Sequence, residues 1–299
     1  MTRLRGSWTA AAAVTLFLLS GCAQQTAAGA PSPGPAPSDS SSPPATPGPE
    51  DALVLRVSSA GGFVPPHLLL GRLPETSVYA DGRVIFNGPV PAVYPGPALP
   101  NLQWGTLSPA NLRQLLDKAV AAGVKPGTDF GQPGVADAPT TEVTVVTADG
   151  KRTVGAVALR EARPDDPQLT KAQQQARKKL RAFVDQLGDL TTAMMTGEPQ
   201  PYRPVALAAI AQPWVDPGDP TGRPRSVPWP GPALPGEKLS PTVDPTCVVA
   251  TGAQLDAVLA AAADATANTP WVWENASWSV LLRPLLPEET GCADLKAAR

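Results

Sequence analysis

Apolar and polar residues alternate along three stretches in the first half of the chain, and this spacing predicts β-strands. In the first stretch, Leu53, Leu55 and Val57 fall on one face, as in a half-buried strand. The stretches 76–86 and 142–159 each alternate on both sides of an Asp-Gly pair. Such a pair predicts a hairpin closed by a type I′ turn, which requires positive φ at both central residues. The two pairs are Asp81-Gly82 and Asp149-Gly150.

Two other stretches repeat their apolar residues every three or four positions, which predicts amphipathic helices. The helix Ser108–Gly123 would begin on a serine N-cap and end on a glycine. The second helix would begin with Thr170 and Gln173 as a capping box and end at Gly188. Hairpins that alternate with helices predict an α+β fold for the segment 51–195, in which antiparallel sheet hairpins have helices packed on one face.

The segment 200–299 is expected to form a second α+β part. A Pro-rich irregular connection covers 212–245, and a short apolar strand then leads to a helix with a capping box at Thr251. Two Trp-containing runs flank the polar residues 274–277, which predicts a third hairpin.

A repeated motif suggests that the chain contains two related halves. Pro-Gly-Pro-Ala-Leu-Pro occurs at 95–100 and again at 230–235, each time followed by Leu-Ser-Pro, a helix and a hairpin. The alternative is coincidence in a chain rich in Pro and Ala. A shared arrangement of helix and strands in the two halves distinguishes these interpretations.

An apolar stretch at residues 9–20 follows two arginines near the N-terminus. It is shorter than the roughly 20 residues that a spanning helix needs, and it is typical of a cleaved signal segment. The stretch ends in Leu19-Ser20-Gly21-Cys22, which resembles the lipobox of bacterial lipoproteins. The resemblance implies a signal peptide at 1–21 and a diacylglyceryl and acyl anchor on Cys22. The alternative is an ordinary secretory signal followed by a chance cysteine.

Residues 22–50 contain almost nothing that a core could bury, and they are rich in Pro, Ser and Gly. This composition predicts a lipidated disordered tether that holds a folded body away from the membrane. A Pro-rich SH3-type ligand is the alternative. The abundance of Ala, Pro and Gly resembles that of envelope lipoproteins of high-GC Gram-positive bacteria. That resemblance implies attachment to the extracytoplasmic face of the cell membrane.

The composition excludes several kinds of site. The 299 residues include one histidine, His67, three cysteines, and a formal net charge of −2. One imidazole excludes a multi-histidine metal centre, and three cysteines exclude a zinc ribbon. With no excess of basic residues, the chain lacks the positive charge that is typical of nucleic-acid-binding proteins. The chain has no phosphate-binding loop, dinucleotide motif or nucleophile elbow, so we expect no cofactor, no metal and no recognisable catalytic residue.

Two cysteines remain when Cys22 is assigned to the lipid anchor. In an exported chain an even remainder predicts a disulfide, here between Cys247 and Cys292. A reactive thiol is the alternative, although the single histidine lies in the other folded segment.

The segment 51–195 also resembles an uncharacterised bacterial domain type with a Tyr-x-Asp-Gly-x-Val hairpin, a helix, and Asp-x-Pro before a second hairpin. The resemblance implies a fold and no activity. The matching residues are Tyr79, Asp81, Gly82, Val84, Asp137 and Pro139.

Tryptophan supplies the candidate binding residues. Trp214 and Trp229 lie in the Pro-rich connection and are candidates for contact with a sugar or a protein. Trp271 and Trp273 share one face of a strand and are expected in the core, with Trp278 across the hairpin.

Polar residues offer weaker candidates. We interpret His67 as a polar loop residue rather than a general base. The neighbouring carboxylates Asp165-Asp166 and Glu288-Glu289 are expected to be solvated rather than to form an acid pair.

The preferred hypothesis is therefore a lipid-anchored cell-envelope protein with a non-catalytic binding or scaffolding module, whose partner is an envelope protein or glycan. The alternative is an exported hydrolase that acts on the cell wall. A pocket in which two carboxylates converge would favour the hydrolase.

Overall fold

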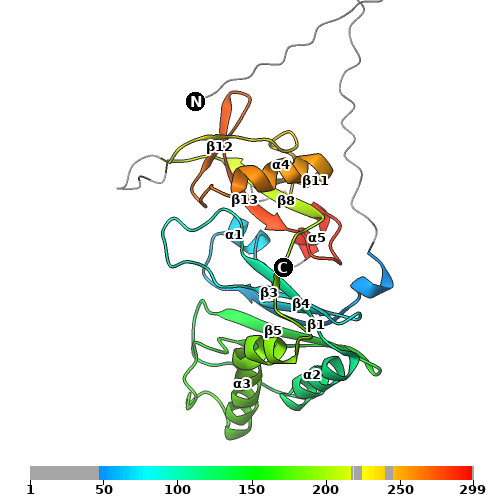
Figure 1. Cartoon of the computed structure of the whole chain (residues 1–299). Helices are drawn as coiled ribbons and strands as arrows, with labels where there is room; N and C mark the ends of the chain where they lie inside the picture. Colours follow the sequence, from blue (N-terminus) through cyan, green and yellow to red (C-terminus); the bar gives the residue numbers. More distant parts are fainter. Residues whose placement is uncertain (1–46, 217, 219–223, 240–244, 298–299) are drawn as a thin grey trace, which may run out of the picture. The chain divides into compact units, whose positions relative to one another are not determined.

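The structure is a computed structural model that describes residues 47–216, 218, 224–239 and 245–297 (Figure 1). These residues belong to one compact unit and form an α+β fold with two sheets, in agreement with the predicted fold class. The signal peptide, the lipidation site Cys22 and the tether up to residue 46 lie outside the described residues.

The first sheet has seven strands in the order β6-β5-β1-β2-β3-β4-β7, and every neighbouring pair is antiparallel. A short 3-10 turn, η1 (Pro49–Asp51), precedes it, so regular structure begins just inside the predicted tether. The strands are β1 (Leu53–Gly61), β2 (Thr76–Tyr79), β3 (Arg83–Asn87), β4 (Leu102–Thr106), β5 (Pro139–Thr147), β6 (Gly150–Val157) and β7 (Gln200–Pro201).

Both predicted hairpins of this segment are present, but their turns are not type I′. Gly82 and Gly150 have φ of +90° and +101°. Neither Asp81 nor Asp149 has positive φ, although a type I′ turn needs it at both central residues. The Asp81 carboxylate instead accepts a 2.9 Å hydrogen bond from the Arg83 backbone N–H. The Asp-Gly pairs therefore predicted the hairpins correctly and the turn type wrongly.

Two amphipathic helices, α2 (Pro109–Ala121) and α3 (Lys171–Met194), cover one face of the first sheet (Figure 1). The caps predicted for these two helices are present: Ser108 accepts from the Asn111 backbone N–H, and Thr170 and Gln173 form a capping box. The capping box predicted at Thr251, before the helix at 252–262, is not formed, because the Thr251 side chain makes no cap hydrogen bond. The predicted end at Gly188 is wrong, because α3 continues for another six residues. Leu187 and Thr191 are buried on either side of Gly188, and this packing outweighs the roughly 1 kcal/mol penalty of a mid-helix glycine.

A β-bulge divides the predicted apolar face of β1. The register with β2 shifts between Leu53 and Leu55. Leu55 and Val57 consequently pack beneath α2 and α3, whereas Leu53 packs with Tyr79 on the opposite face. A bulge inserts a residue and so breaks the period-2 alternation on which the sequence prediction rested.

The second sheet has six strands in the order β10-β11-β8-β13-β12-β9. All neighbouring pairs are antiparallel except β12 and β9, which are parallel. The third predicted hairpin is β12–β13, and it pairs Trp271 directly with Trp278. The elements are β8 (Ala206–Pro213), β9 (Val227–Pro228), β10 (Glu237–Lys238), β11 (Thr246–Thr251), α4 (Gly252–Ala262), β12 (Pro270–Trp273), β13 (Ala276–Pro284) and α5 (Cys292–Ala297).

Helices pack on both faces of this second sheet, unlike the first. Strand β8 is buried from Ala206 to Ala211. Its residues Leu207 and Ala209 pack in the same core as α4, while Ala208 and Ile210 pack with α5 and with the short helix α1 (Pro66–Leu70). The small alanine side chains let layers approach this strand closely from either side.

The two sheets do not share one strand order, which bears on the hypothesis of related halves. In the first sheet the hairpin β5–β6 joins the central strand β1 through its first strand. In the second sheet the hairpin β12–β13 joins the central strand β8 through its second strand. Each half combines a sheet with helices, but the connections differ.

The two folded segments share cores and are not packed independently. Leu70 of α1, from the first segment, lies in one cluster with Ile210 and Leu295 of the second. Leu286 of the second segment lies in another cluster with Tyr79 and Ile85 of the first. The predicted boundary near residue 200 therefore separates two sheets within one compact unit.

Candidate functional site

A partly buried cluster of charged side chains joins the two sheets. Arg56 of β1 forms an ion pair with Glu288. The Tyr79 hydroxyl donates a 2.6 Å hydrogen bond to the same carboxylate. Arg283 of β13 donates from Nη1 and Nη2 to the two oxygens of Glu289, at 2.6 and 2.7 Å. Residues from strands of both sheets thus hold a pair of adjacent glutamates.

Burial keeps two tyrosine hydroxyls of this region protonated. Burial raises the pKa of the Tyr79 hydroxyl well above its usual range, although the positive charge of Arg56 opposes the effect. Burial likewise raises the pKa of Tyr202 to about 12, and its hydroxyl donates to the Leu285 carbonyl at 2.9 Å. Both tyrosines are therefore neutral hydrogen-bond donors at neutral pH.

The expectation that Glu288-Glu289 is solvated is wrong. The side chains of Glu288 and Glu289 are 21% and 11% exposed, and each pairs with an arginine. The expectation for Asp165-Asp166 holds for only one residue: Asp165 is 70% exposed, whereas Asp166 is buried. Sequence alone did not show that strands of two different sheets bring cations to Glu288-Glu289.

A charged pocket of about 330 Å³ lies beside this cluster. Two carboxylates, Glu142 and Glu289, line it, as a hydrolase would need. Glu289, however, already accepts hydrogen bonds from Arg283 and, at 2.8 Å, from the Leu286 backbone N–H. A carboxylate in a bidentate ion pair is poorly suited to proton transfer. The charged side chains of the lining are Arg56, Arg72, Lys151, Arg283, Glu142 and Glu289.

A second pocket, of about 350 Å³, contains two residues singled out from the sequence, His67 and Trp214. We call it the apolar pocket. Ile210, Val280 and Leu281 contribute apolar surface from β8 and β13. Its hydrogen-bonding groups include Gln212, Asn268 and Ser279, and no Asp, Glu, Lys or Arg is among the described residues that line it. Such a lining suits an uncharged group with a few polar contacts.

Exposed apolar side chains concentrate on the segments that form this pocket. Seven of the eight large hydrophobic residues exposed in the described part of the chain lie in three segments, 63–68, 90–94 and 214–215. Two of these exposed residues, Leu68 and Val215, line the apolar pocket. Tyr94 lies beside it, because the pocket residue Asn268 donates a 3.3 Å hydrogen bond to the Tyr94 hydroxyl. We call the seven residues the apolar rim: Phe63, Val64, Leu68, Val90, Val93, Tyr94 and Val215.

His67 is the second residue of α1, which begins at Pro66 and has Pro65 as its N-cap. Burial lowers the pKa of its imidazole below the ordinary value of 6.5. The side chain is therefore mainly neutral at pH 7, and it faces a pocket without charged lining residues among those described. A neutral imidazole can both donate and accept one hydrogen bond there.

Trp229 is not available as a binding residue, in contrast to the sequence prediction. It is 3% exposed, and its ring lies edge-on to Trp271 with centroids 5.5 Å apart. Its indole Nε1–H donates to the Pro232 carbonyl at 2.7 Å. The Pro-rich connection that contains Trp229 pairs with β12 through β9, and this pairing places the indole in the core.

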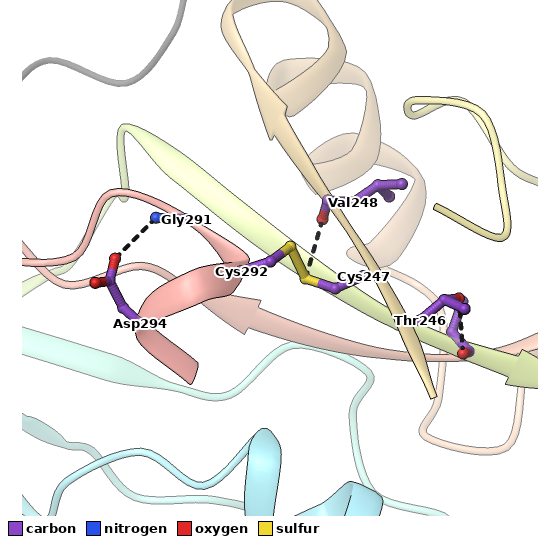
Figure 2. The surroundings of a disulfide bond; sticks show 7 residues. Thr246, Cys247, Val248, Gly291, Cys292 and Asp294 are labelled. Carbon is purple, nitrogen blue, oxygen red and sulfur yellow. Dashed lines mark hydrogen bonds between the residues drawn. A yellow bond between two sulfur atoms is a disulfide. The ribbon is translucent and has the colours of Figure 1, made fainter. Parts of the chain in front are cut away.

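The structure joins Cys247 and Cys292 in the predicted disulfide. Figure 2 shows Cys292 at the start of α5 bonded to Cys247 of β11. The two Cα atoms are 6.0 Å apart across 45 positions of sequence, and both residues are buried. Asp294 accepts a 3.0 Å hydrogen bond from the Gly291 backbone N–H in the first turn of α5. The bond fixes the C-terminal helix to the second sheet.

Within the described ranges, no three His, Cys, Asp or Glu side chains gather in a way that could hold a metal ion. No helix in that part of the chain has both the length and the apolar character to cross a membrane. Comparison with known proteins finds no matching family model, no matching curated protein and no matching solved structure.

Proposed function

We propose that this chain is a lipid-anchored cell-envelope protein whose folded body binds an uncharged apolar segment of another envelope protein. The observation that carries this proposal is that the exposed apolar residues Leu68 and Val215 line an uncharged pocket, with Tyr94 hydrogen-bonded to its residue Asn268. Large apolar patches on a soluble surface are typical of interaction sites. The lipobox-like sequence at Leu19–Cys22 supports the anchor.

The chemistry of the pocket favours a peptide over a charged ligand. The segments 88–98 and 61–66 contain no Asp, Glu, Lys or Arg, so a charged partner would lose hydration there without an ionic contact in return. Gln212, Asn268 and Ser279 offer amide and hydroxyl groups that can bond a peptide backbone. A volume of about 350 Å³ is at the small end of ligand pockets and suits one or two side chains.

The described residues that line the two pockets favour binding over hydrolysis, because they offer few carboxylates that are free to exchange a proton. The charged pocket contains Glu142 and Glu289, but Glu289 is fixed by Arg283. The apolar pocket offers one neutral histidine, and no carboxylate is among its described lining residues. An acid–base mechanism needs a group that is free to exchange a proton with the substrate.

The anchor is tested by the substitution Cys22→Ala. We expect the protein to move from the membrane fraction to the soluble fraction, because two acyl chains give stable attachment and would then be absent. Cys247→Ala is the matched control, since it removes a cysteine of the body and should leave the protein with the membrane. Membrane retention of the Cys22→Ala variant would contradict the anchor.

The partner surface is tested by photo-crosslinking in intact cells. A photoreactive residue at Tyr94, in the apolar rim, should crosslink a defined protein, and Leu68→Ser should suppress that product. The matched control is Val205, which is 73% exposed but lies outside the rim, and it should not give the same product. Crosslinks from Tyr94 to lipid or glycan alone, or a product that Leu68→Ser leaves unchanged, would overturn the proposal.

A further inference from the structure

A groove of about 640 Å³ lies along the N-terminal half of α3, against the segment 159–169. It shares no residue with the apolar pocket or the apolar rim. Five cations and a single carboxylate, Asp185, are found among its described lining residues. The whole chain carries a formal charge of −2, so this groove is a local exception. The cations are Arg163, Lys171, Arg177, Lys178 and Arg181.

Arg177 places a positive charge at the buried side of the groove. It is 6% exposed, and its guanidinium donates only to backbone carbonyls, at 3.2 Å to Phe130, 2.8 Å to Val157 and 2.7 Å to Ala158. No carboxylate within the described residues forms an ion pair with it; Asp166 and Glu161 act on it from farther away. A buried cation without an ionic partner is costly, and an anion in the groove would reduce that cost.

The exposed cations differ in how strongly they are already engaged. Arg163 pairs with Asp165, and Arg181 lies 3.4 Å from Asp185. Arg160 competes for Asp185 at 3.0 Å. Lys178 forms no hydrogen bond or ion pair with any residue that the structure describes. Lys178 is therefore the cation of the groove that is freest to meet an anion.

The groove also has an apolar floor. Leu159, Ala162 and Leu169 line it and are each at most 6% exposed. Pro164 and Ala182 add further apolar surface. Its volume falls within the range of roughly 300–1,000 Å³ that is usual for small-molecule sites. A ligand complementary to this lining combines a negative group with an apolar part.

We propose that the groove between α3 and residues 159–169 binds an amphiphile whose phosphate headgroup has a net negative charge, with the phosphate near Lys178 and the apolar part over Leu159 and Leu169. Phosphate suits this site because several lysine and arginine donors can share its oxygens. The ligand enters as a single molecule, since the site is a groove with an apolar floor rather than a flat charged surface. This inference is independent of the proposed partner-binding function.

Isothermal titration of the full chain carrying Cys22→Ser tests the proposal. The probe is dihexanoyl phosphatidylglycerol, used as a monomer. Dihexanoyl phosphatidylcholine has the same tails without net charge, and glycerol 3-phosphate has the phosphate without tails. We expect binding of the first probe and at least tenfold weaker binding of the other two, because phosphatidylcholine has no net negative charge and glycerol 3-phosphate has no apolar part.

Substitution of neighbouring lysines locates the site. Lys178→Gln should weaken binding of dihexanoyl phosphatidylglycerol by about tenfold, the effect of losing one charge-assisted contact. Lys179→Gln makes the same change of charge on the next residue of α3, which does not line the groove, and should leave the affinity within about twofold. Equal losses in the two variants, equal binding of the phosphatidylcholine, or no binding of the anionic probe would overturn the proposal.

Discussion

The Tyr79 hydroxyl donates a 2.6 Å hydrogen bond to Glu288, a residue 209 positions later in the chain. Tyr79 belongs to β2 in the first sheet, and Glu288 follows β13 of the second. The bond lies next to the ion pair between Arg56 and Glu288. It links the hairpin that gives the first segment its Tyr-x-Asp-Gly-x-Val pattern to the C-terminal part of the chain.

Tyr79→Phe should lower the free energy of unfolding by about 1.5–3 kcal/mol, because it removes a hydrogen bond to a charged and largely buried acceptor. Urea denaturation followed by circular dichroism measures the change. Tyr94→Phe is the control: Tyr94 is 80% exposed, so its hydroxyl should contribute less than about 0.5 kcal/mol. Equal effects in the two variants would show that the contact with Glu288 adds nothing.

Arg283→Met should destabilise the protein by about 3–5 kcal/mol, because it leaves the buried carboxylate of Glu289 without its partner. The side chains of this pair are 3% and 11% exposed. Arg203→Met breaks a pair with Asp256 whose side chains are 71% and 63% exposed, and should cost less than about 1 kcal/mol. Urea denaturation of both variants measures these losses. Equal shifts of the two unfolding midpoints would contradict a strong contribution from the Arg283–Glu289 pair.

The double variant Cys247→Ala, Cys292→Ala should lose about 4 kcal/mol of stability on the chain-entropy description of a loop of this length. Thermal unfolding with and without reductant measures the effect, and reductant should have no influence on the double variant. Cys22→Ser should unfold like the unaltered chain, because it leaves the disulfide in place. Mass analysis that finds both Cys247 and Cys292 as free thiols in the non-reduced protein would rule out the bond.

His67 should titrate below 6.5, because its burial disfavours the charged imidazolium. The unfolded chain then binds a proton more readily than the folded chain. The contribution of His67 to the free energy of unfolding is therefore fully present above pH 6.5. It is lost as the pH falls through the lower pKa of the folded state. His67 is the chain's single histidine, so its imidazole proton signals in an NMR titration need no assignment by mutation. A folded pKa at or above the value measured in urea would contradict the prediction.

Gly82→Ala should destabilise the fold more than Gly127→Ala. Both glycines have positive φ, +90° and +77°, which costs an alanine about 1 kcal/mol. A Cβ at Gly82 would in addition lie 2.4 Å from the Leu107 carbonyl oxygen, whereas a Cβ at Gly127 meets nothing within 4 Å. The difference in the free energy of unfolding between the two variants, measured by urea denaturation, gives the cost of this close contact. Equal losses would mean that the backbone near Leu107 can move away from the new Cβ at no cost.

Local features of the fold could be predicted because their causes are local. The capping box of Thr170 and Gln173 is satisfied within one turn of helix, and the Asp-Gly pairs mark hairpins whose strands are adjacent in sequence. Errors occurred where distant packing outweighed a local preference. Burial of Leu187 and Thr191 carries α3 past Gly188, and a bulge in β1 turns Leu53 away from Leu55.

The candidate sites could not be predicted to the same extent. Trp214 was identified from its sequence position, and the structure places it in a pocket with His67. Trp229 has the same Pro-rich surroundings in sequence but pairs into the core. Trp229 is buried where β9 pairs with β12, whereas Trp214 lines a pocket at the end of β8. Both placements depend on contacts between segments that are far apart in the chain.

By itself the sequence determined the hairpins, the caps of α2 and α3 and the pairing of Cys247 with Cys292, because each depends on neighbouring residues or on a count of residue types. The tertiary structure alone decided that Glu288 and Glu289 are buried against arginines of two sheets. It alone decided that His67 and Trp214 line one pocket with Leu68 and Val215, and that Lys178 lines a groove while Lys179 does not. The physical reason is that a site needs several side chains to converge in space, and convergence is set by long-range packing rather than by the pattern within any one segment.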